Sequence, residues 1–303
     1  MDRAALENLK KVPLLPKLIE YINIPYTSMS RLKHFGSFLR VNEKQLPSVY
    51  GLMREACKIL EVDEPYFYIN PESEINAYVS CSDKPIVCVS GYLVDVMDDE
   101  ELMFVIGHEL AHIKSGHLRY KPVGEVLRQG ILDSILSSIP GVGLASGGVI
   151  IALNYAYFQW YQAGEFTCDR GGFLACQNFE ASCRALMKLA GSSQRYISEL
   201  NLEEFMKQAH EFESVGFETL GNIQKIILSY GATHPQTIAR AFELQKFKEN
   251  GLYSDILQRN TTQGVKHTPP EPPAPVSKEN NVARETVDKA KSIAGNMLSK
   301  FKI

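Results

Sequence analysis

The hydrophobic and polar positions of the chain change their period near residue 92. From residue 45 to 62, apolar residues recur every three or four positions, which predicts an amphipathic helix. Beyond residue 92 the pattern is helical almost to residue 260. Between these regions, short runs rich in Tyr, Val and Ile are divided by turn residues and predict strands at 66–70, 75–79 and 85–91. The predicted fold class is therefore α+β and mainly α, with one small sheet.

Composition sets the domain boundaries. Residues 1–44 form an N-terminal arm ahead of a main folded domain at 45–260. Residues 261–280 carry five prolines and little apolar bulk, which predicts an extended linker. Residues 281–303 resume a helical pattern and predict a C-terminal amphipathic helix.

The C-terminal segment admits several interpretations. Its apolar residues alternate in threes and fours, and lysines add positive charge at 289, 291, 300 and 302. Such a helix can lie on a membrane surface, bind a partner or fold back on the main domain. It can equally be a frayed, solvated helix, and the pattern does not choose among these.

Bulk charge and cysteine usage narrow the function classes. A net charge of -3 over 303 residues argues against nucleic-acid binding through bulk electrostatics, so we expect no nucleic-acid partner. The first 21 residues contain no secretory signal, and the six cysteines include no Cys-x-x-Cys pair and no metal-ligand spacing. We expect reduced, mostly buried thiols and a cytoplasmic location.

One helical segment carries candidate chemistry. Asp98 followed by Glu101 predicts a capping box, the apolar residues after them recur at helical spacing, and Gly116 can end the helix. This placement puts His108 and His112 four residues apart, on one face of the helix.

Two imidazoles at this spacing can hold one zinc ion. Glu109, next to the first histidine, can then take a proton from water at the metal. With seven histidines in the chain, a His-Glu-x-x-His motif arises by chance in roughly one chain in a hundred, so the motif alone is suggestive. The alternative is a helix with two ordinary histidines and a surface glutamate.

A catalytic zinc site needs a third protein ligand and an open position for water. Glu165 and Asp169 lie four apart and share a helix face, so one carboxylate can bind zinc while the other orients a ligand histidine. The alternative is a solvated charge pair between Glu165 and Asp169 or Arg170.

His117 is a second candidate for the third ligand. The metzincin arrangement needs Gly three and His six positions beyond the second motif histidine, but Ser115 and Leu118 stand there. We therefore expect His117 either to support a ligand or to be exposed.

Three segments together carry a family resemblance. They read Gly-His-Glu-Leu-Ala-His-Ile at 107–113, Glu-x-x-x-Asp-Arg at 165–170, and Thr-His-Pro with a later Arg at 233–240. In this combination the chain resembles the HtpX-like and CAAX-prenyl-protease zinc peptidases, metallopeptidase family 48, over roughly residues 45–245. The resemblance implies a gluzincin with a zincin-like domain, in which a small edge-strand sheet lies over the HExxH helix.

The resemblance also implies roles for the motif residues. His108, His112 and Glu165 would bind one zinc ion per chain, with Glu109 as the general base. Asp169 would be the supporting carboxylate.

Further residues would surround that site. His234 would stabilise the oxyanion of the tetrahedral intermediate, and Arg240 would hold that region in place. Asn76, Ala77 and Tyr78 match the edge strand whose backbone pairs with an extended substrate.

The uncharged stretch 134–164 raises the question of a membrane span. A crossing helix needs about 20 apolar residues, so two crossings need about 40. A single crossing would put His112 and Glu165 on opposite sides of the bilayer. We therefore expect two buried or interfacial helices joined by a Gly-rich turn. Peripheral membrane contact through 134–164 or 281–303 remains open.

The function expected from the sequence is a zinc metalloendopeptidase that cuts extended or unfolded protein segments. Two alternatives belong to other classes: a catalytically idle, zinc-bearing peptide-binding protein, and a membrane-surface adaptor whose working part is the tail. The intact Glu109 argues against the first, because a pure binder needs no general base beside the metal. Deletion of residues 261–303 would distinguish the membrane-surface adaptor from a peptidase. The adaptor would lose its function, while a peptidase would still cut an unfolded protein.

Overall fold

The computed structural model describes residues 2–13, 15–80, 84–130, 132, 135, 147–191, 194–215 and 237–262. Contacts divide the chain into two units, Met1–Asp255 and Ile256–Ile303, and the described part of the second is the end of one helix. The linker beyond residue 262, the expected C-terminal helix and His234 lie outside the described residues. Among the residues that are described, no helix is long and apolar enough to cross a membrane.

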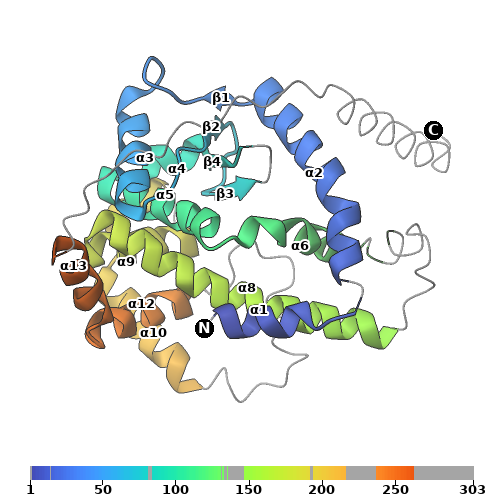
Figure 1. Ribbon diagram of the computed structural model, residues 1–303. Coiled ribbons are helices and arrows are strands. Elements are labelled where there is room, and N and C mark those ends of the chain that lie inside the picture. The colour runs from blue at the N-terminus through green and yellow to red at the C-terminus, as the bar shows by residue number, and fades with distance from the viewer. Residues whose placement is uncertain are drawn as a thin grey trace. The chain divides into compact units, whose positions relative to one another are not determined.

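A four-stranded sheet lies on one side of the first unit (Figure 1). Its strands are β1 (Leu39–Arg40), β2 (Tyr66–Asn70), β3 (Ala77–Ser80) and β4 (Ile86–Ser90), in the order β1-β2-β4-β3. The central pair β2 and β4 is parallel, and the outer strands β1 and β3 pair antiparallel. The three predicted strands are confirmed to within about two residues, and only the two-residue β1 was not predicted.

Helices make up most of the rest, so the prediction of an α+β, mainly α fold is confirmed. In chain order they are α1 (Asp2–Lys10), α2 (Leu15–Ser37), α3 (Pro47–Leu60), α4 (Gly91–Val96), α5 (Asp99–Lys114), α6 (Lys121–Arg128), α8 (Gly147–Cys176), α9 (Phe179–Ala190), α10 (Leu202–Val215), α12 (Thr237–Glu249) and α13 (Leu252–Thr262). Two short 3-10 turns cover His117–Arg119 and Gln194–Glu199.

The motif helix α5 begins as its sequence predicts. The Asp98 side chain accepts a hydrogen bond from the Glu101 amide at 2.9 Å, and the Glu101 side chain accepts one from the Asp98 amide at 2.9 Å. The helix ends at Lys114, and Gly116 follows with a φ of 71°, a left-handed conformation that glycine adopts without strain. Every residue of α5 from Glu101 to His112 is buried, so α5 is the centre of the unit.

Helix α8 packs directly on α5, and small residues make this close approach possible. A Cβ atom built on Gly171 would lie 2.4 Å from the Cβ of Ala111, and one on Gly107 would lie 2.5 Å from the Cβ of Ala175. Neither glycine can therefore carry a side chain unless the helices separate. This crossing sets the distance between the motif histidines and the carboxylates of α8.

The structure describes mainly the second half of the stretch 134–164, so the expected pair of helices is not tested as a pair. Gly147 and Gly148 are helical, and α8 continues through Gly164 and Glu165 to Cys176, a length of 30 residues. One helix thus brings the uncharged stretch and the carboxylates together. The segment before Gly147 lies mostly outside the described residues.

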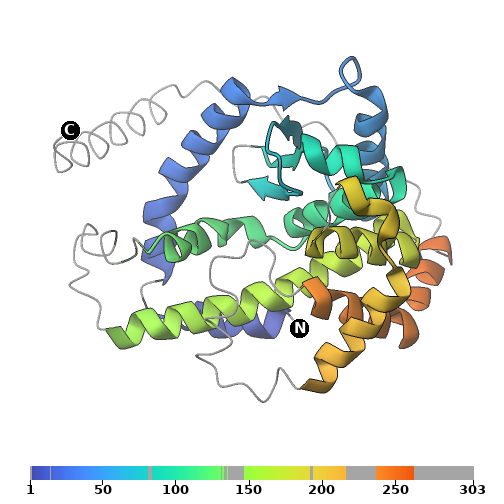
Figure 2. The ribbon, with the colours of Figure 1, turned by 180° about the vertical axis from the view of Figure 1, so that it is seen from behind.

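The N-terminal helices pack against the same unit (Figure 2). Helix α1 runs along α8, and α2 contacts α6. Their buried residues, among them Leu9, Leu15 and Leu18, join Val123 and Trp160 in one hydrophobic cluster. Helix α1 and the first half of α2 are therefore held by apolar burial, which stabilises by about 25 cal/mol per Å² removed from water.

Candidate metal centre

Two histidines of α5 and one glutamate of α8 point their donor atoms at one another. The Nε2 atom of His108 lies 3.5 Å from one carboxylate oxygen of Glu165, and Nε2 of His112 lies 3.4 Å from the other. Each side chain is at most 4% exposed. Two imidazole nitrogens and one carboxylate oxygen form a donor set that zinc binds in catalytic sites, so the residues present fit a zinc ion.

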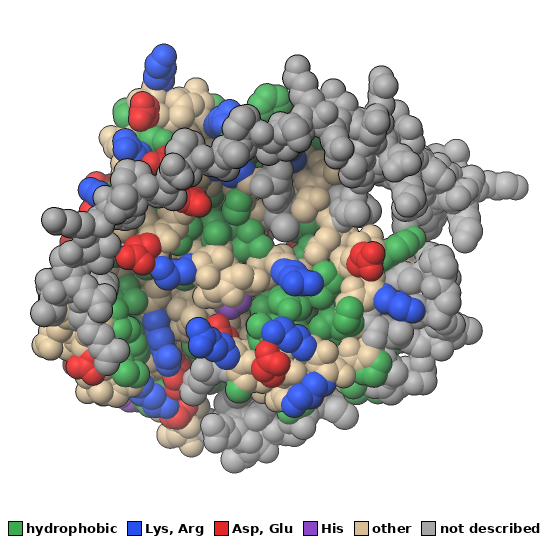
Figure 3. All heavy atoms as spheres, viewed as in Figure 1, with side chains coloured by type: hydrophobic (Ala, Val, Ile, Leu, Met, Phe, Trp, Pro, Cys, Tyr) green, Lys and Arg blue, Asp and Glu red, His purple; other side chains and the backbone are tan. Residues whose placement is uncertain are grey.

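The surface above these side chains is nearly closed. In the view of Figure 3 hydrophobic, basic and acidic side chains are mixed with other atoms on this face of the molecule, and little of any histidine is visible. This agrees with exposed fractions of 3% for His108 and 2% for His112. Burial strengthens electrostatic interactions among the site residues, because little water screens them.

His108 is held from behind by a buried ion pair. Its Nδ1 atom lies 2.9 Å from Oδ1 of Asp169. Arg240 of α12 donates two hydrogen bonds to the same carboxylate, from Nε to Oδ2 at 2.8 Å and from Nη2 to Oδ1 at 2.6 Å. All three side chains are at most 4% exposed. A carboxylate on Nδ1 leaves the Nε2 lone pair directed at Glu165, which is the orientation a metal ligand requires.

The charges around His108 favour a cation in the site. Burial alone would lower the pKa of His108, but hydrogen bonds to Asp169 and Glu165 raise it to about 9. Burial would raise the pKa of Asp169, yet the charge and hydrogen bonds of Arg240 hold it below its ordinary value. The Asp169 carboxylate thus remains ionised and favours positive charge on the His108 side of the site.

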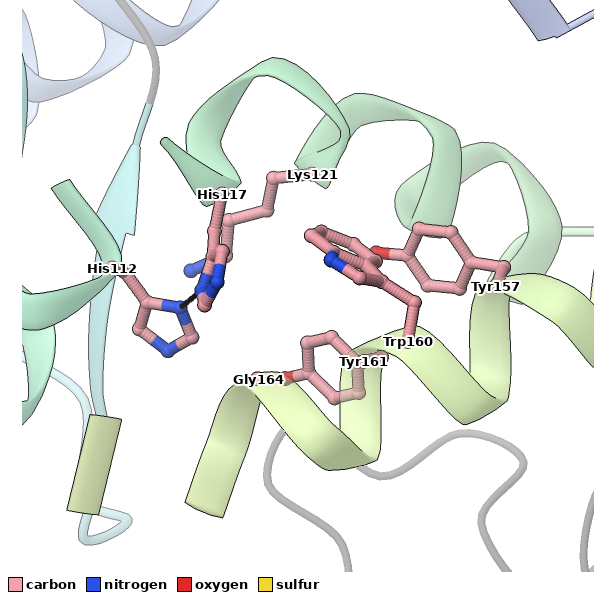
Figure 4. Close-up of a pocket in the computed structure, with 7 residues that line it drawn as sticks. All are labelled: His112, His117, Lys121, Tyr157, Trp160, Tyr161 and Gly164. Atoms are coloured by element: carbon pink, nitrogen blue, oxygen red, sulfur yellow. Dashed lines mark hydrogen bonds between the residues drawn. The ribbon is translucent and has the colours of Figure 1, made fainter. Parts of the chain in front are cut away.

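His112 is supported by different residues (Figure 4). Its Nδ1 atom lies 3.0 Å from Nδ1 of His117, and Nε2 of His117 lies 3.3 Å from Oδ2 of Asp2 at the start of α1. His117 is 5% exposed. The expectation of an exposed His117 is therefore wrong, and its contact with His112 is the one that a supporting residue would make. Burial lowers the pKa of His112 to about 3, which favours the neutral form that binds metal.

Cys168 is a neighbour that the sequence did not identify. It is fully buried and, with His108 and His112, forms the one group of potential metal donors found within 4.8 Å of one another among the described residues. Its position one turn after Glu165 on α8 was the available signal, since residues three apart share a helix face.

Glu165 suits the third position better than Cys168. The Nε2 atoms of both histidines face the Glu165 carboxylate, whereas the Cys168 sulfur lies 3.7 Å from Nδ1 of His117, beside the supporting residues. Burial, followed by the neighbouring carboxylates, raises the pKa of the Cys168 thiol well above its ordinary value. A second anion at this place would be costly, so the thiol form is favoured.

The remaining predicted residues fall on three elements. Glu109 is buried on α5 beside His108, with an exposed fraction of 1%. Arg240 lies on α12, where it binds Asp169 and approaches Glu165 at 3.6 Å. His234 lies outside the described residues.

The predicted substrate strand lies at an edge of the sheet. Ala77 and Tyr78 belong to β3, which packs against α5, and Asn76 precedes it. The Ser90 amide donates to the Asn76 carbonyl at 2.8 Å, and this sets the alternation of the ladder. The backbone groups of Ala77 and Val79 therefore face away from β4, toward the edge of the sheet.

Comparison with known proteins agrees with this geometry. A family model described as Peptidase family M48 matches residues 45–248. The chain therefore belongs to this family of metallopeptidases.

Among its curated relatives is the plastoglobule-localized metallopeptidase 48, chloroplastic, of Arabidopsis thaliana, which is 27% identical over 259 residues, covering 84% of this chain and 73% of the relative. A protease HtpX homolog of Streptococcus pyogenes serotype M3 (strain SSI-1) is 28% identical over 118 residues, covering 38% of this chain and 39% of the relative. A second HtpX homolog, from Streptococcus gordonii (strain Challis / ATCC 35105 / BCRC 15272 / CH1 / DL1 / V288), is 26% identical over 133 residues, covering 43% and 44% of the two chains. The chain is an HtpX-like M48 metallopeptidase, and it spans less than half the length of the HtpX relatives.

Proposed function

We propose that this protein is a zinc-dependent endopeptidase that cuts extended or unfolded protein segments. The observation that carries the proposal is the convergence of Nε2 of His108, Nε2 of His112 and the two oxygens of Glu165, with Glu109 buried beside them. One zinc ion per chain would be held by these three residues. Such an ion supplies Lewis acidity toward the scissile carbonyl and lowers the pKa of water.

The chain's own residues perform the proton transfers. Glu109 accepts a proton from the attacking water and passes it to the leaving amine, a role that needs a carboxylate next to the ligands. Asp169 and Arg240 keep Nε2 of His108 directed at the site. A hydrogen bond from His234 to the developing negative charge is proposed on the family resemblance.

The substrate is proposed to bind as an added strand beside β3. Backbone groups of Val79 face the edge of the sheet, and an extended chain can pair with such groups without demands on its own side chains. Asn76, Ala77 and Tyr78 would belong to this binding strand. This mode favours unfolded segments over folded ones, because folded proteins already satisfy their backbone hydrogen bonds.

The partners follow from this mode. Protein or peptide substrates are proposed, without nucleic acid. Contact with a membrane surface through 134–164 is supported only by Ile151, which is 64% exposed near the start of α8, and 281–303 lies outside the described residues. Five cysteines among the described residues are free, which is compatible with a reducing compartment such as the cytoplasm.

The decisive experiment compares wild type with Glu109→Gln on a casein-like unfolded substrate, with bound zinc quantified in both. Equal zinc and a loss of about 10²- to 10⁴-fold in the rate are expected, because only the proton acceptor is removed. Glu100→Gln, an exposed carboxylate on the same helix, is the matched control and should cut normally. Cleavage that survives in Glu109→Gln contradicts the mechanism. A zinc-loaded wild type that binds casein without cutting it would instead identify the idle binding protein.

Two variants, Glu165→Gln and Cys168→Ser, test which residue is the third zinc ligand. Glu165→Gln should lose most of its bound zinc, because it removes the charged oxygens that face both histidines. Cys168→Ser should retain zinc near one equivalent. The reverse result would assign the third position to Cys168.

A further inference from the structure

His117 stands between a proposed metal ligand and the N-terminal helix. One ring nitrogen, Nδ1, lies 3.0 Å from Nδ1 of His112, and the other, Nε2, lies 3.3 Å from the Asp2 carboxylate. Asp2 is separated from His117 by 115 positions in sequence, and it lies before residue 45, where the family match begins. The first turn of α1 therefore reaches residues that touch the metal centre.

The protons of this chain of contacts can be arranged in one consistent way. The carboxylate of Asp2 only accepts, so Nε2 of His117 must donate to it. In a neutral imidazole the other nitrogen then accepts, and Nδ1 of His117 receives a hydrogen bond from Nδ1 of His112. Nε2 of His112 is left with its lone pair, and this is the atom that faces Glu165.

Packing holds the His117 ring in the plane that these bonds need (Figure 4). Trp160 of α8 meets it edge-on, with ring centroids 5.3 Å apart and an interplanar angle of 85°. A Cβ atom on Gly164 would lie 3.1 Å from Cε1 of His117, so the absence of a side chain there makes room for the ring. The orientation of the ring is thus set by α8 as well as by hydrogen bonds.

We propose that His117 and Asp2 are positioning residues that fix the tautomer and direction of His112 for zinc. The inference rests on the proposed function in taking His112 as a ligand. Its readout is zinc affinity, which is measured without any cleavage. If zinc affinity falls as expected while wild type cuts no substrate, the positioning role stands and the endopeptidase proposal fails.

The test uses the full chain and competition with a zinc chelator. His117→Phe keeps a ring against Trp160 but has no nitrogen acceptor, and its zinc Kd should rise about 10- to 100-fold. The visible spectrum of the cobalt-substituted protein should change with it, since the geometry of a ligand changes. A Kd within about twofold of wild type in a folded His117→Phe overturns the proposal.

The Asp2 variants decide the matter even if His117→Phe does not fold. Asp2→Ala removes the acceptor for Nε2 of His117 and should weaken zinc binding by less than His117→Phe. Asp2→Asn retains an acceptor oxygen, so it should restore much of the affinity. Glu7→Gln, an exposed residue on the same helix, is the control and should bind zinc as wild type does. Equal affinity of Asp2→Ala and wild type overturns the role of Asp2.

A second inference comes from α2, which exposes three large apolar side chains on one face. Met29, Leu32 and Phe35 are 70%, 74% and 72% exposed. The opposite face is attached to the sheet, where Ser30 shares a hydrogen bond of 2.6 Å with Ser80 and His34 lies 3.1 Å from the Tyr78 hydroxyl. The apolar face therefore points away from the sheet residues that α2 contacts.

Basic residues border this apolar face on both sides. Successive residues turn by about 100° in a helix, which puts Arg31 on one flank of the face and Lys33 on the other. Residues 21–42 contain three basic residues and no acidic residue. An apolar centre with basic flanks matches a helix lying in the headgroup region of an anionic membrane.

We propose that this face of α2 binds an anionic lipid surface. A second copy of the chain fits less well, because a two-fold contact through this face would bring the basic flanks of both copies together. The apolar residues would enter the boundary of the acyl chains, and the basic residues would meet lipid phosphates.

Flotation with vesicles tests this proposal. The full chain should float with vesicles that contain phosphatidylserine and much less with phosphatidylcholine alone. Lys33→Gln should weaken binding about fivefold, the effect of one basic residue near such a surface, and Leu32→Ser should weaken it at least as much. Leu252→Ser, an exposed apolar residue of α13, is the control. Failure to float, or a dimer that Leu32→Ser dissociates, overturns the proposal.

Discussion

The two motif histidines have the same expected role and are supported in opposite ways. Behind His108 stands a charged pair, Asp169 with Arg240, at most 2% exposed and joined by two short hydrogen bonds. Behind His112 stands a neutral ring, His117, whose own partner Asp2 is 19% exposed and 3.3 Å away. One histidine is held by the core of the family domain, and the other is supported from a helix that lies before the matched residues.

The two sets of contacts differ in how much free energy their loss should cost. A buried bidentate ion pair is rigid and costly to break, because either partner left alone is a buried, uncompensated charge. A chain of hydrogen bonds that runs through a neutral ring to a partly exposed carboxylate costs less to disturb. We therefore expect variants on the His108 side to damage fold and site together, and variants on the His112 side to damage mainly the site.

The largest effect is expected for Arg240→Ala. It leaves Asp169 and Glu165 buried without their shared cation, which should cost about 3–5 kcal/mol of unfolding free energy. Urea denaturation with and without a zinc chelator measures it. Asp2→Ala, the counterpart on the His112 side, should cost less than about 1 kcal/mol. Equal losses in the two variants would remove the contrast.

The next largest effect is expected for the packing of α8 on α5, which places Glu165 opposite both His108 and His112. Gly171→Val places a side chain where a Cβ atom already lies 2.4 Å from that of Ala111, so α8 must move from α5 at a cost of about 1–3 kcal/mol. Thermal unfolding measures the loss. Gly51→Ala on α3 meets nothing within 4 Å and should instead stabilise by about 0.5–1 kcal/mol. An unchanged unfolding temperature in Gly171→Val would show that α5 and α8 are loosely packed where they cross.

The contact behind His108 can also be weakened by a substitution that removes the charge of Asp169 and keeps an oxygen that can accept a hydrogen bond. Asp169→Asn keeps an acceptor oxygen for His108 but loses the charge that Arg240 pairs with. Zinc Kd should rise about 10- to 100-fold. Asp2→Asn on the other side should change it much less, because the charge of Asp2 is partly solvated. Chelator competition on both variants shows whether charge matters on one side or on both.

The smallest effect is a pH dependence of the attachment of α2. Burial lowers the pKa of His34 below its ordinary value, so folding favours the neutral ring. The corresponding stability is present above about pH 6.5 and is lost as the pH falls below it. Groups facing His34 are Lys33 on α2, which also lowers its pKa, and Tyr78 on β3. Hydrogen exchange of α2 should quicken toward about pH 5.5 in wild type and change less in His34→Gln.

Local signals predicted much of this molecule from its sequence. The capping box of Asp98 and Glu101 and the strands β2, β3 and β4 depend on neighbours within a few residues, so their patterns are legible in one stretch of chain. The spacing of His108 and His112 and that of Glu165 and Asp169 likewise follow from helix geometry. Cys168 was missed because its signal, a place one turn after Glu165, relates it to a glutamate and not to another cysteine.

Local sequence was enough to predict the three main strands, the motif face of α5 and the carboxylate face of α8, because each follows from a short-range period. The folded arrangement was needed to learn which nitrogen of each histidine faces Glu165 and which residue lies behind each ring. Arg240 is 71 positions from Asp169, and Asp2 is 115 positions from His117. No local period relates such residues, since their contact results from the packing of α1, α5, α8 and α12 on one another.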